Sequence, residues 1–396
     1  MLAPASIHSA SKSALENSNG VDRLSSLPDE LLHHVMSFLP MPEVVRTSLL
    51  SVRWRSLWAS TPFVHIDYQD FKDENKPRGV DDEKLKEFGD HLLLLRDDAV
   101  CLDEARIFVT HGSSWNNFAW VRHAIKHKVR LLQVSGSVHS PYLDSTSMFP
   151  SQHLKIIRLQ SLFLCHRFFA MLNNEWSVVE YLELEECSLI RVKEISSRSL
   201  KVLHMIRCFN GEGLLICARS LTDLSILDPT CLGAIVTRDL SSLSSESLNF
   251  PIDTMVYGHR LLHGLSHATT LELHAPLHEL AFERGMQTCP MFNNLTSLLL
   301  GNWCMVADFY PLLRILQGSS KLKELNVKLK MEECSICKKS ESALSSSRAT
   351  LSGRGNYPSI ERIKICCLEE DPRVYALVNA LQPTINPDGK ISIERC

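Results

Sequence analysis

The stretch VEYLELEECSL, residues 179–189, carries the pattern on which the fold depends. Leu182 and Leu184 alternate with charged residues, and a two-residue period of this kind is typical of a strand with one buried face. Similar stretches recur as LKVLHMIRCF at 200–209, LTSLLLGNWCM at 295–305 and LKELNVKLKM at 322–331. Recurrence along the chain predicts repeated structural units rather than one globular core.

A pair of apolar residues separated by one position marks each unit. The pairs are Ile107/Val109, Leu132/Val134, Ile157/Leu159, Leu182/Leu184, Leu203/Met205, Leu224/Ile226, Leu248/Phe250, Leu271/Leu273, Leu298/Leu300, Leu325/Val327 and Ile363/Ile365. Most intervals between them are 21 to 27 residues, and the last is 38. Several units approximate the leucine-rich-repeat signature L-x-x-L-x-L-x-x-N/C-x-L, with Cys187 and Cys208 in its N/C slot. We therefore expect an α/β repeat solenoid, a leucine-rich-repeat horseshoe, over residues 105–330.

The residue between the two apolar positions is expected to point to the concave face of such a solenoid. The candidate target-binding residues are Arg158, Glu183, His204, Ser225, Glu272 and Asn326, and Leu299 and Lys364 fall at the same position. No charge sign dominates, which favours a protein-binding surface over a groove for phosphates.

The composition argues against two classes of function, nucleic-acid binding and membrane insertion. The 396 residues are 44% hydrophobic and 22% charged, with a net charge of -3, so the chain has no basic surplus for nucleic acid. No apolar run approaches the roughly 18 residues of a membrane span. The 13 cysteines show no disulfide framework, which suits a reducing compartment, so we expect residence in the nucleus, the cytoplasm or both.

The sequence contains no recognisable catalytic motif. It has no G-x-x-x-x-G-K-[ST], H-E-x-x-H or G-x-S-x-G segment, and we expect neither an enzyme nor a cofactor. A zinc site built on Cys334 and Cys337, with Cys366 and Cys367, is the alternative. We prefer thiols in and near a loop, because the spacing of the four cysteines is irregular.

The remaining segments divide the chain. Residues 1–20 are expected to form a disordered tail, 67–104 an acidic linker with a helix near 82–96, 331–357 a flexible insertion, and 358–396 a C-terminal repeat or cap.

Before the linker, LPDELLHHVMSFLPMPEVVRTSLLSVRWRSLW (residues 27–58) predicts three short helices, with Ser26 as the first cap and Pro40 and Pro42 ending the first helix. That helix carries two apolar stripes, Leu27/Leu31/Val35/Phe38 and Leu32/Met36/Leu39. One stripe is enough to close so small a bundle. Periodicity leaves open whether the other packs on this chain or on another protein.

Residues 21–66 resemble the F-box of plant F-box proteins with leucine-rich repeats, and the C-terminal region is similar to their FBD-type ends. The matching residues are Leu27-Pro28, Glu30-Leu31-Leu32, Phe38-Leu39, Val45-Arg46-Thr47-Ser48, Ser51, Arg53-Trp54-Arg55 and Leu57-Trp58. Val52 departs from the family, which usually has a basic residue there.

The resemblance implies a substrate-recognition subunit of an SCF-type ubiquitin ligase. The F-box would bind a Skp-type adaptor and, through it, a cullin-RING scaffold, while the repeats would bind a protein target of unknown identity. The leading adaptor contacts would be Leu27, Pro28, Leu31 and Leu32, and contacts or packing behind them would come from Val35, Leu39, Val45, Ser48 and Trp54. The alternative is a leucine-rich-repeat interaction scaffold, unconnected with ubiquitin, whose helices merely cap one end.

Overall fold

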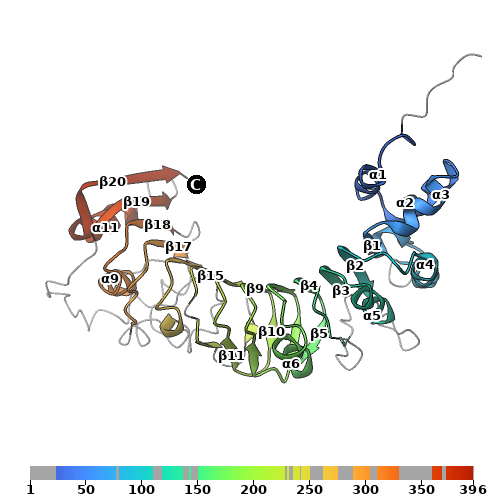
Figure 1. Cartoon of the computed structure of the whole chain (residues 1–396). Coiled ribbons are helices and arrows are strands. Elements are labelled where there is room, and N and C mark those ends of the chain that lie inside the picture. The colour runs from blue at the N-terminus through green and yellow to red at the C-terminus, as the bar shows by residue number, and fades with distance from the viewer. Residues whose placement is uncertain are drawn as a thin grey trace, which may run out of the picture.

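The computed structural model describes residues 24–76, 80–109, 118–136, 142–143, 150–227, 230–231, 235–240, 242–249, 262–274, 289–303, 310–329, 359–367 and 372–395. The expected tail at 1–20 and insertion at 331–357 lie outside these residues. The described chain forms an open arc (Figure 1). A helical unit stands at one end, parallel strands follow the inner side of the arc, and other helices and shorter strands lie on its outer side.

The N-terminal helical unit, residues 24–60, has the three expected helices, each shortened by prolines and turns. They are α1 (Asp29–Met36), α2 (Met41–Arg46) and α3 (Trp54–Leu57), with 3-10 turns at Thr47–Leu49 and Trp58–Ser60. The predicted cap was wrong: Pro28, not Ser26, occupies the N-cap position of α1. The carboxylates of Asp29 and Glu30 favour this helix end by opposing its dipole.

A 13-stranded sheet with only parallel pairings runs the length of the arc. Its strands are β1 (Phe63–Ile66), β2 (Glu104–Val109), β3 (Leu131–Gly136), β4 (Ile156–Gln160), β6 (Tyr181–Glu185), β9 (Val202–Ile206), β12 (Asp223–Leu227), β15 (Ser245–Asn249), β16 (Thr270–His274), β17 (Ser297–Trp303), β18 (Glu324–Leu329), β19 (Ile360–Cys367) and β20 (Ile385–Arg395). Where a connection is described in full, as between β4 and β6, the chain returns over the outer side before the next strand begins, and this return makes the two strands parallel.

The strand register corrects two of the predicted apolar pairs. In β2 the aligned pair is Ala105/Ile107, because Ala105 pairs with Leu132 of β3. In β15 it is Glu246/Leu248, because Glu246 pairs with Leu224 on one side and Leu271 on the other. Ala105 is small and Glu246 is charged, so neither stood out as a core position, and both pairs were predicted two residues too far along the chain. Strand β1 was missed altogether.

The outer side of the arc depends on repeat length. Leu182, Leu203 and Leu224 are 21 residues apart, and there the return path consists of short strands rather than a helix. These strands form two further parallel sheets: β5 (Phe163–Cys165), β7 (Ser188–Ile190), β10 (Phe209–Asn210) and β13 (Thr230–Cys231), and then β8 (Glu194–Ser196), β11 (Leu214–Cys217) and β14 (Ile235–Arg238).

Longer repeats accommodate helices on the outer side. These are α5 (Phe118–Lys126), α6 (His166–Asn174) and α9 (Tyr310–Gln317), each between consecutive strands of the large sheet, and α11 (Pro372–Leu381) lies between β19 and β20. No helix in the described ranges is long and apolar enough to cross a membrane.

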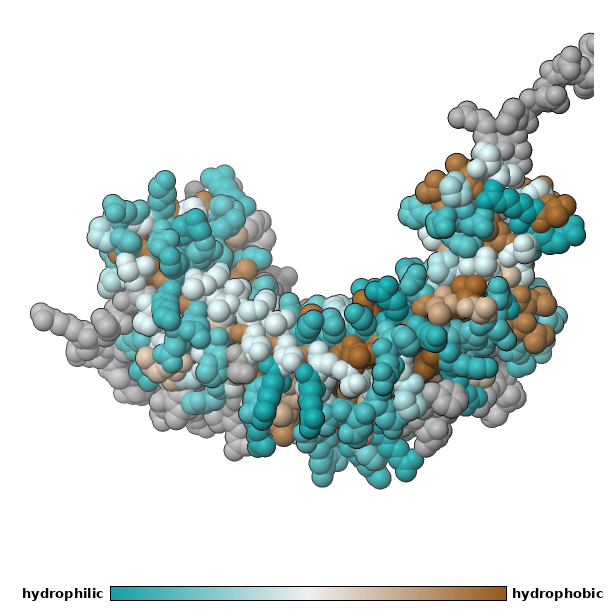
Figure 2. Space-filling model, in the orientation of Figure 1, coloured by the Kyte–Doolittle hydropathy of each residue, from teal (hydrophilic) through white to brown (hydrophobic). Residues whose placement is uncertain are grey.

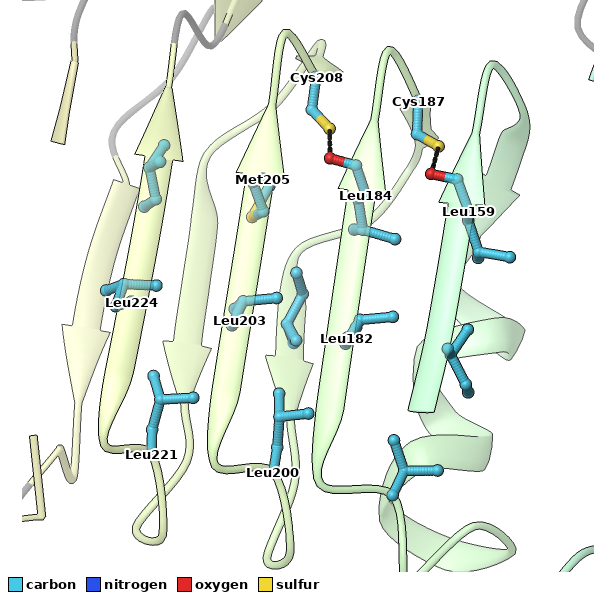
Figure 3. Close-up of a cluster of buried hydrophobic side chains, with 14 of the residues drawn as sticks. Leu159, Leu182, Leu184, Cys187, Leu200, Leu203, Met205, Cys208, Leu221 and Leu224 are labelled. Atoms are coloured by element: carbon cyan, nitrogen blue, oxygen red, sulfur yellow. Dashed lines mark hydrogen bonds between the residues drawn. The ribbon is translucent and has the colours of Figure 1, made fainter. Parts of the chain in front are cut away.

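Buried leucines and two cysteines fill the space between the layers (Figure 3). The Cys187 thiol donates to the carbonyl of Leu159 at 3.4 Å, and that of Cys208 to the carbonyl of Leu184 at 3.3 Å. The repeat slot therefore holds a small donor that satisfies a carbonyl of the preceding unit, and burial raises the pKa of the Cys187 thiol.

A left-handed residue precedes this slot in three consecutive units. The φ angles are 53° at Ser161, 52° at Glu186 and 49° at Arg207. This conformation costs a non-glycine residue roughly 1 kcal/mol, yet it recurs because it turns the following side chain, such as Cys187, into the core.

Helix α4 (Asp82–Leu95) occupies the place predicted for it and packs against α5. Gly89 permits the close approach, since a Cβ there would lie 2.5 Å from the ring of Trp120. The indole of Trp120 also donates to Asp90 at 2.8 Å. The sequence predicted the helix from its amphipathic pattern, but not its partner.

Replacing a buried leucine of the ladder is expected to destabilise the protein strongly. Leu203→Ala removes a fully buried side chain and should lower the free energy of unfolding by about 2 to 5 kcal/mol. Leu94→Ala is the matched control, because Leu94 is 77% exposed, and should change it by less than about 0.5 kcal/mol. Urea denaturation followed by circular dichroism measures both. Equal effects would contradict the packing described.

Acidification is expected to destabilise the region around α5. Burial, with contributions from His127 and Arg96, lowers the pKa of His123 from 6.5 to about 4, and burial also lowers the pKa of His127. The unfolded chain therefore binds these protons more readily, and stability that is complete above pH 6.5 falls as the pH decreases toward 4.

Urea denaturation at pH 7 and pH 5 should show an unfolding free energy lower at pH 5, with His123 contributing on the order of 1 kcal/mol of the decrease. His123→Gln should reduce the decrease. His91→Gln, which changes an exposed histidine of α4, should leave it unchanged. A His123→Gln protein with the full pH dependence would show that another group is responsible.

Candidate functional site: an apolar helical surface and a polar sheet face

The N-terminal helical unit has a complete core of its own. The side chains of Leu32, Met36, Met41, Val44, Trp54, Leu57 and Trp58 are buried. All three helices contribute, and the cluster continues into the first strands of the sheet. The stripe formed by Leu32 and Met36 is the one that closes the bundle.

The other stripe of α1 faces solvent. Leu31 is 50% exposed, Val35 43% and Phe38 75%, and these residues follow one another at helical spacing. We call Leu31, Val35, Phe38 and the neighbouring Leu39 the α1 patch. Figure 2 shows hydrophobic surface on the helices at this end of the arc. This grouping of exposed apolar side chains on so small a unit makes the α1 patch a candidate binding surface.

A second group of exposed apolar side chains follows α2. Leu49, Leu50 and Val52 are all more than 60% exposed. The sequence reading omitted Leu49 and Leu50 from its candidate residues, and it left Phe38 on its stripe without a role. The available signal was the run SLLSV, in which consecutive apolar residues cannot all face one core.

The predicted adaptor contacts fall into three groups by burial. Pro28, Leu31, Val35 and Leu39 are exposed, Leu27, Val45 and Ser48 are half-buried, and Leu32 and Trp54 are buried. The expectation that Leu32 is a leading contact is corrected, because its side chain is enclosed by the core of the unit. Trp54 packs in the same core. Of the two roles expected for it, adaptor contact or packing behind the contacts, its burial favours the second.

Arg53 fixes the segment that leads into α1. Its guanidinium donates to the carbonyl of Leu27 at 2.6 Å and also to the carbonyl of Ser25 and the carboxylate of Asp29. Beside it, the indole of Trp54 donates to the Ser25 hydroxyl at 3.0 Å. The basic–aromatic pair near the end of the unit thus positions the start of the α1 patch.

Arg96 joins the helical unit to the sheet. Its guanidinium is buried and donates to the hydroxyl of Thr61 at 3.0 Å, the carbonyl of Phe63 at 3.2 Å and the carbonyl of Thr61 at 2.5 Å. Burial lowers the pKa of Arg96 to about 10. The amide of Asp97 also donates to the carbonyl of Ala59 at 3.1 Å. These bonds hold the end of the helical unit against β1.

The inner face of the large sheet brings the predicted target-binding residues into one row. The register pairs Arg158 with Glu183, Glu183 with His204 and His204 with Ser225, and the row continues through Ser247 to Glu272, Leu299, Asn326 and Lys364. The expected common face is therefore present. Ser225 is buried, at 8% exposed, and Glu183, His204, Glu272 and Asn326 are half-buried.

Side chains on this face are linked across strands. Tyr181 donates to Glu183 at 2.7 Å and lies 3.3 Å from Nδ1 of His204, whose Nε2 lies 3.2 Å from Asp223. Arg158 pairs with Glu183 at 3.3 Å and lies over the Tyr181 ring. Burial and the Glu183 carboxylate raise the pKa of Tyr181.

No cluster of three or more potential metal ligands occurs in the described part of the chain, and Cys334 and Cys337 of the alternative zinc site lie outside it.

Comparison with known proteins identifies the domain family that the helical unit matches. The sequence profile of the family described as the F-box domain matches residues 24–66. The meiotic F-box protein MOF of rice (Oryza sativa subsp. japonica) is 30% identical, over 77% of this chain and 71% of the rice protein. The chain belongs to the plant F-box/leucine-rich-repeat family.

Other relatives agree with this membership. An F-box/FBD/LRR-repeat protein of Arabidopsis thaliana is 28% identical, over 88% of this chain and 86% of its own length. An Arabidopsis F-box/LRR-repeat protein is 30% identical, over 58% of this chain and 53% of its own length. The resemblance to F-box proteins with leucine-rich repeats is therefore confirmed. The F-box match ends at Ile66, so it includes strand β1, and the F-box shares a continuous core with the sheet.

Removing Arg96 is expected to weaken the junction between the F-box and the sheet. Arg96→Met leaves the buried carbonyls of Thr61 and Phe63 without this donor, and should lower the free energy of unfolding by roughly 2 to 4 kcal/mol. Arg55→Met alters an exposed arginine of α3 and serves as the control. Urea denaturation measures both variants. An Arg96→Met protein as stable as the control would show that the junction does not depend on this side chain.

Proposed function

We propose that this chain is the substrate-recognition subunit of an SCF-type cullin-RING ubiquitin ligase. The F-box would bind a Skp-type adaptor through the α1 patch, with the group at Leu49, Leu50 and Val52 as a further apolar contact. The single observation that carries this proposal is the exposed stripe Leu31/Val35/Phe38 on a unit whose core is already filled by other residues. A helical cap that only ends a repeat array is expected to have a polar outer face, whereas this stripe is apolar.

We infer that the parallel sheet is the concave surface of a leucine-rich-repeat horseshoe and that the target protein binds there. The regular row of residues from Arg158 to Lys364 supports this inference, because the row presents one side chain per strand along the arc. In this role the chain catalyses nothing itself. It raises the effective concentration of a bound target near a ubiquitin-charged enzyme carried by other subunits.

Co-purification with a plant Skp-type adaptor tests the proposal. The wild-type chain and the Leu94→Lys control should form a one-to-one complex on size exclusion, whereas Leu31→Lys/Phe38→Lys should lose at least about tenfold in affinity. Leu94 is also an exposed leucine, but it lies on α4. A wild-type chain that ignores the adaptor and remains a monomer would reject the ligase function. The chain would then be assigned as an interaction scaffold unconnected with ubiquitin.

Adjacent leucines of α1 should behave differently in the same experiment. Leu31→Ala should weaken adaptor binding while changing the free energy of unfolding by less than about 0.5 kcal/mol, since Leu31 lies at the surface. Leu32→Ala should lower the free energy of unfolding by about 2 to 5 kcal/mol, since Leu32 is fully buried. Titration of labelled adaptor and urea denaturation separate the two effects. The reverse assignment would show that α1 is rotated relative to this structure.

A further inference from the structure

The inner face of the sheet carries an acidic section at its centre. Across β9, β12, β15 and β16, the inner-face positions include the carboxylates of Asp223 and Glu272, and no position there holds a lysine or arginine. The two carboxylates lie on strands two steps apart, or roughly 10 Å. We call these four strands the acidic section.

Histidines accompany both carboxylates. Nε2 of His204 lies 3.2 Å from Asp223, and Nε2 of His274 bonds the carboxylate of Glu272. Gly301 of the next strand leaves room for the His274 ring, because a Cβ at position 301 would lie 2.1 Å from Nδ1 of His274. Each carboxylate is thus oriented by a neighbouring histidine.

The opposite sign occurs toward the C-terminal end of the same face. Strands β18, β19 and β20 place Lys328, Arg362, Lys364 and Lys390 on it, against Glu324 and Glu394. Arg362 pairs with Glu324, and Lys364 with Glu394 at 2.6 Å. Lys328 and Lys390 therefore supply an excess of positive charge, and both are exposed. We call these three strands the basic section.

An uncharged strand separates the two sections. Strand β17 lies between β16 and β18 and presents Ser297, Leu299 and Gly301 to the inner face. The half-buried Leu299 is aliphatic, and a binding partner can cover it without desolvating a charge. From β15 to β19, near the middles of the sections, there are four strand spacings, or roughly 19 Å, which an extended chain spans in about six residues.

We propose that this face binds a charge-segregated polypeptide segment of the target. The segment lies across the strands, with lysine or arginine over Asp223 and Glu272, an apolar residue over Leu299, and aspartate or glutamate over Lys328 and Lys390. This inference deepens the proposed function. It rests on that function only in identifying the segment as part of a ubiquitination target. The complementarity itself depends only on the sheet.

Fluorescence anisotropy with labelled peptides on the full-length chain tests the proposal. The probes carry three lysines and three glutamates separated by about six residues of Gly, Ser and one central Leu, in both orders, and a control peptide of the same composition alternates the charges. One order of the segregated peptide should bind at least about tenfold more tightly than the alternating peptide at low salt, where surface charges are least screened.

Matched variants locate the site. Asp223→Asn/Glu272→Gln and Lys328→Gln/Lys390→Gln should each weaken binding of the segregated peptide by about tenfold. Glu175→Gln/Glu194→Gln removes two exposed carboxylates that lie outside the large sheet, and should leave binding unchanged. Equal binding of the two peptides, absence of binding, or the same affinity for the inner-face variants as for wild type would each overturn the proposal.

Adaptor co-purification of the same variants keeps the two proposals apart. All of them retain the α1 patch and should bind the adaptor as wild type does. A chain that binds the segregated peptide but no adaptor supports the face and rejects the ligase role, whereas one that binds the adaptor but not the peptide rejects only the charge-segregated target.

Discussion

The parallel register of the large sheet is the constraint on which the rest of the structure depends. Over most of the sheet each strand pairs with its neighbours so that core residues meet core residues, as Leu184 meets Leu159 on one side and Met205 on the other. A slip of one residue in any strand would turn its buried side chains to solvent. The same register aligns the inner-face side chains, so the order of charges along the arc follows directly from the packing of the leucines.

Two surfaces of different character result from this construction. The α1 patch is apolar because the core of the helical unit is completed without Leu31, Val35 and Phe38. The inner face mixes charged, polar and aliphatic side chains because each strand buries only alternate residues, and its carboxylates and basic groups are held by neighbours such as Tyr181 and His204. A surface of the first kind suits one constant partner, and a surface of the second kind suits recognition by charge pattern.

The sequence predicted the strands of the array well where the core residues were large and aliphatic. It failed at Ala105 and Glu246, because the prediction relied on large aliphatic side chains, whereas the register is set by backbone hydrogen bonds. It predicted which residues share the inner face, but it did not reveal that acidic and basic side chains occupy different sections of the arc. That segregation of charge appears only when the residues are grouped by strand. For the F-box it identified both stripes of α1 but could not tell which one faced inward. That choice depends on contacts from Met41, Val44 and Leu57, which lie on other helices.

The buried guanidinium of Arg96 has a further consequence for how a bound protein would be presented. Because it ties the last turn of the helical unit to β1, the F-box and the sheet share one core and are held in a defined relative orientation. Under the proposed function, the receptor then fixes the distance between the adaptor and the bound segment. Which lysine of a target receives ubiquitin would be decided by its position in space relative to that segment, more than by the residues around it.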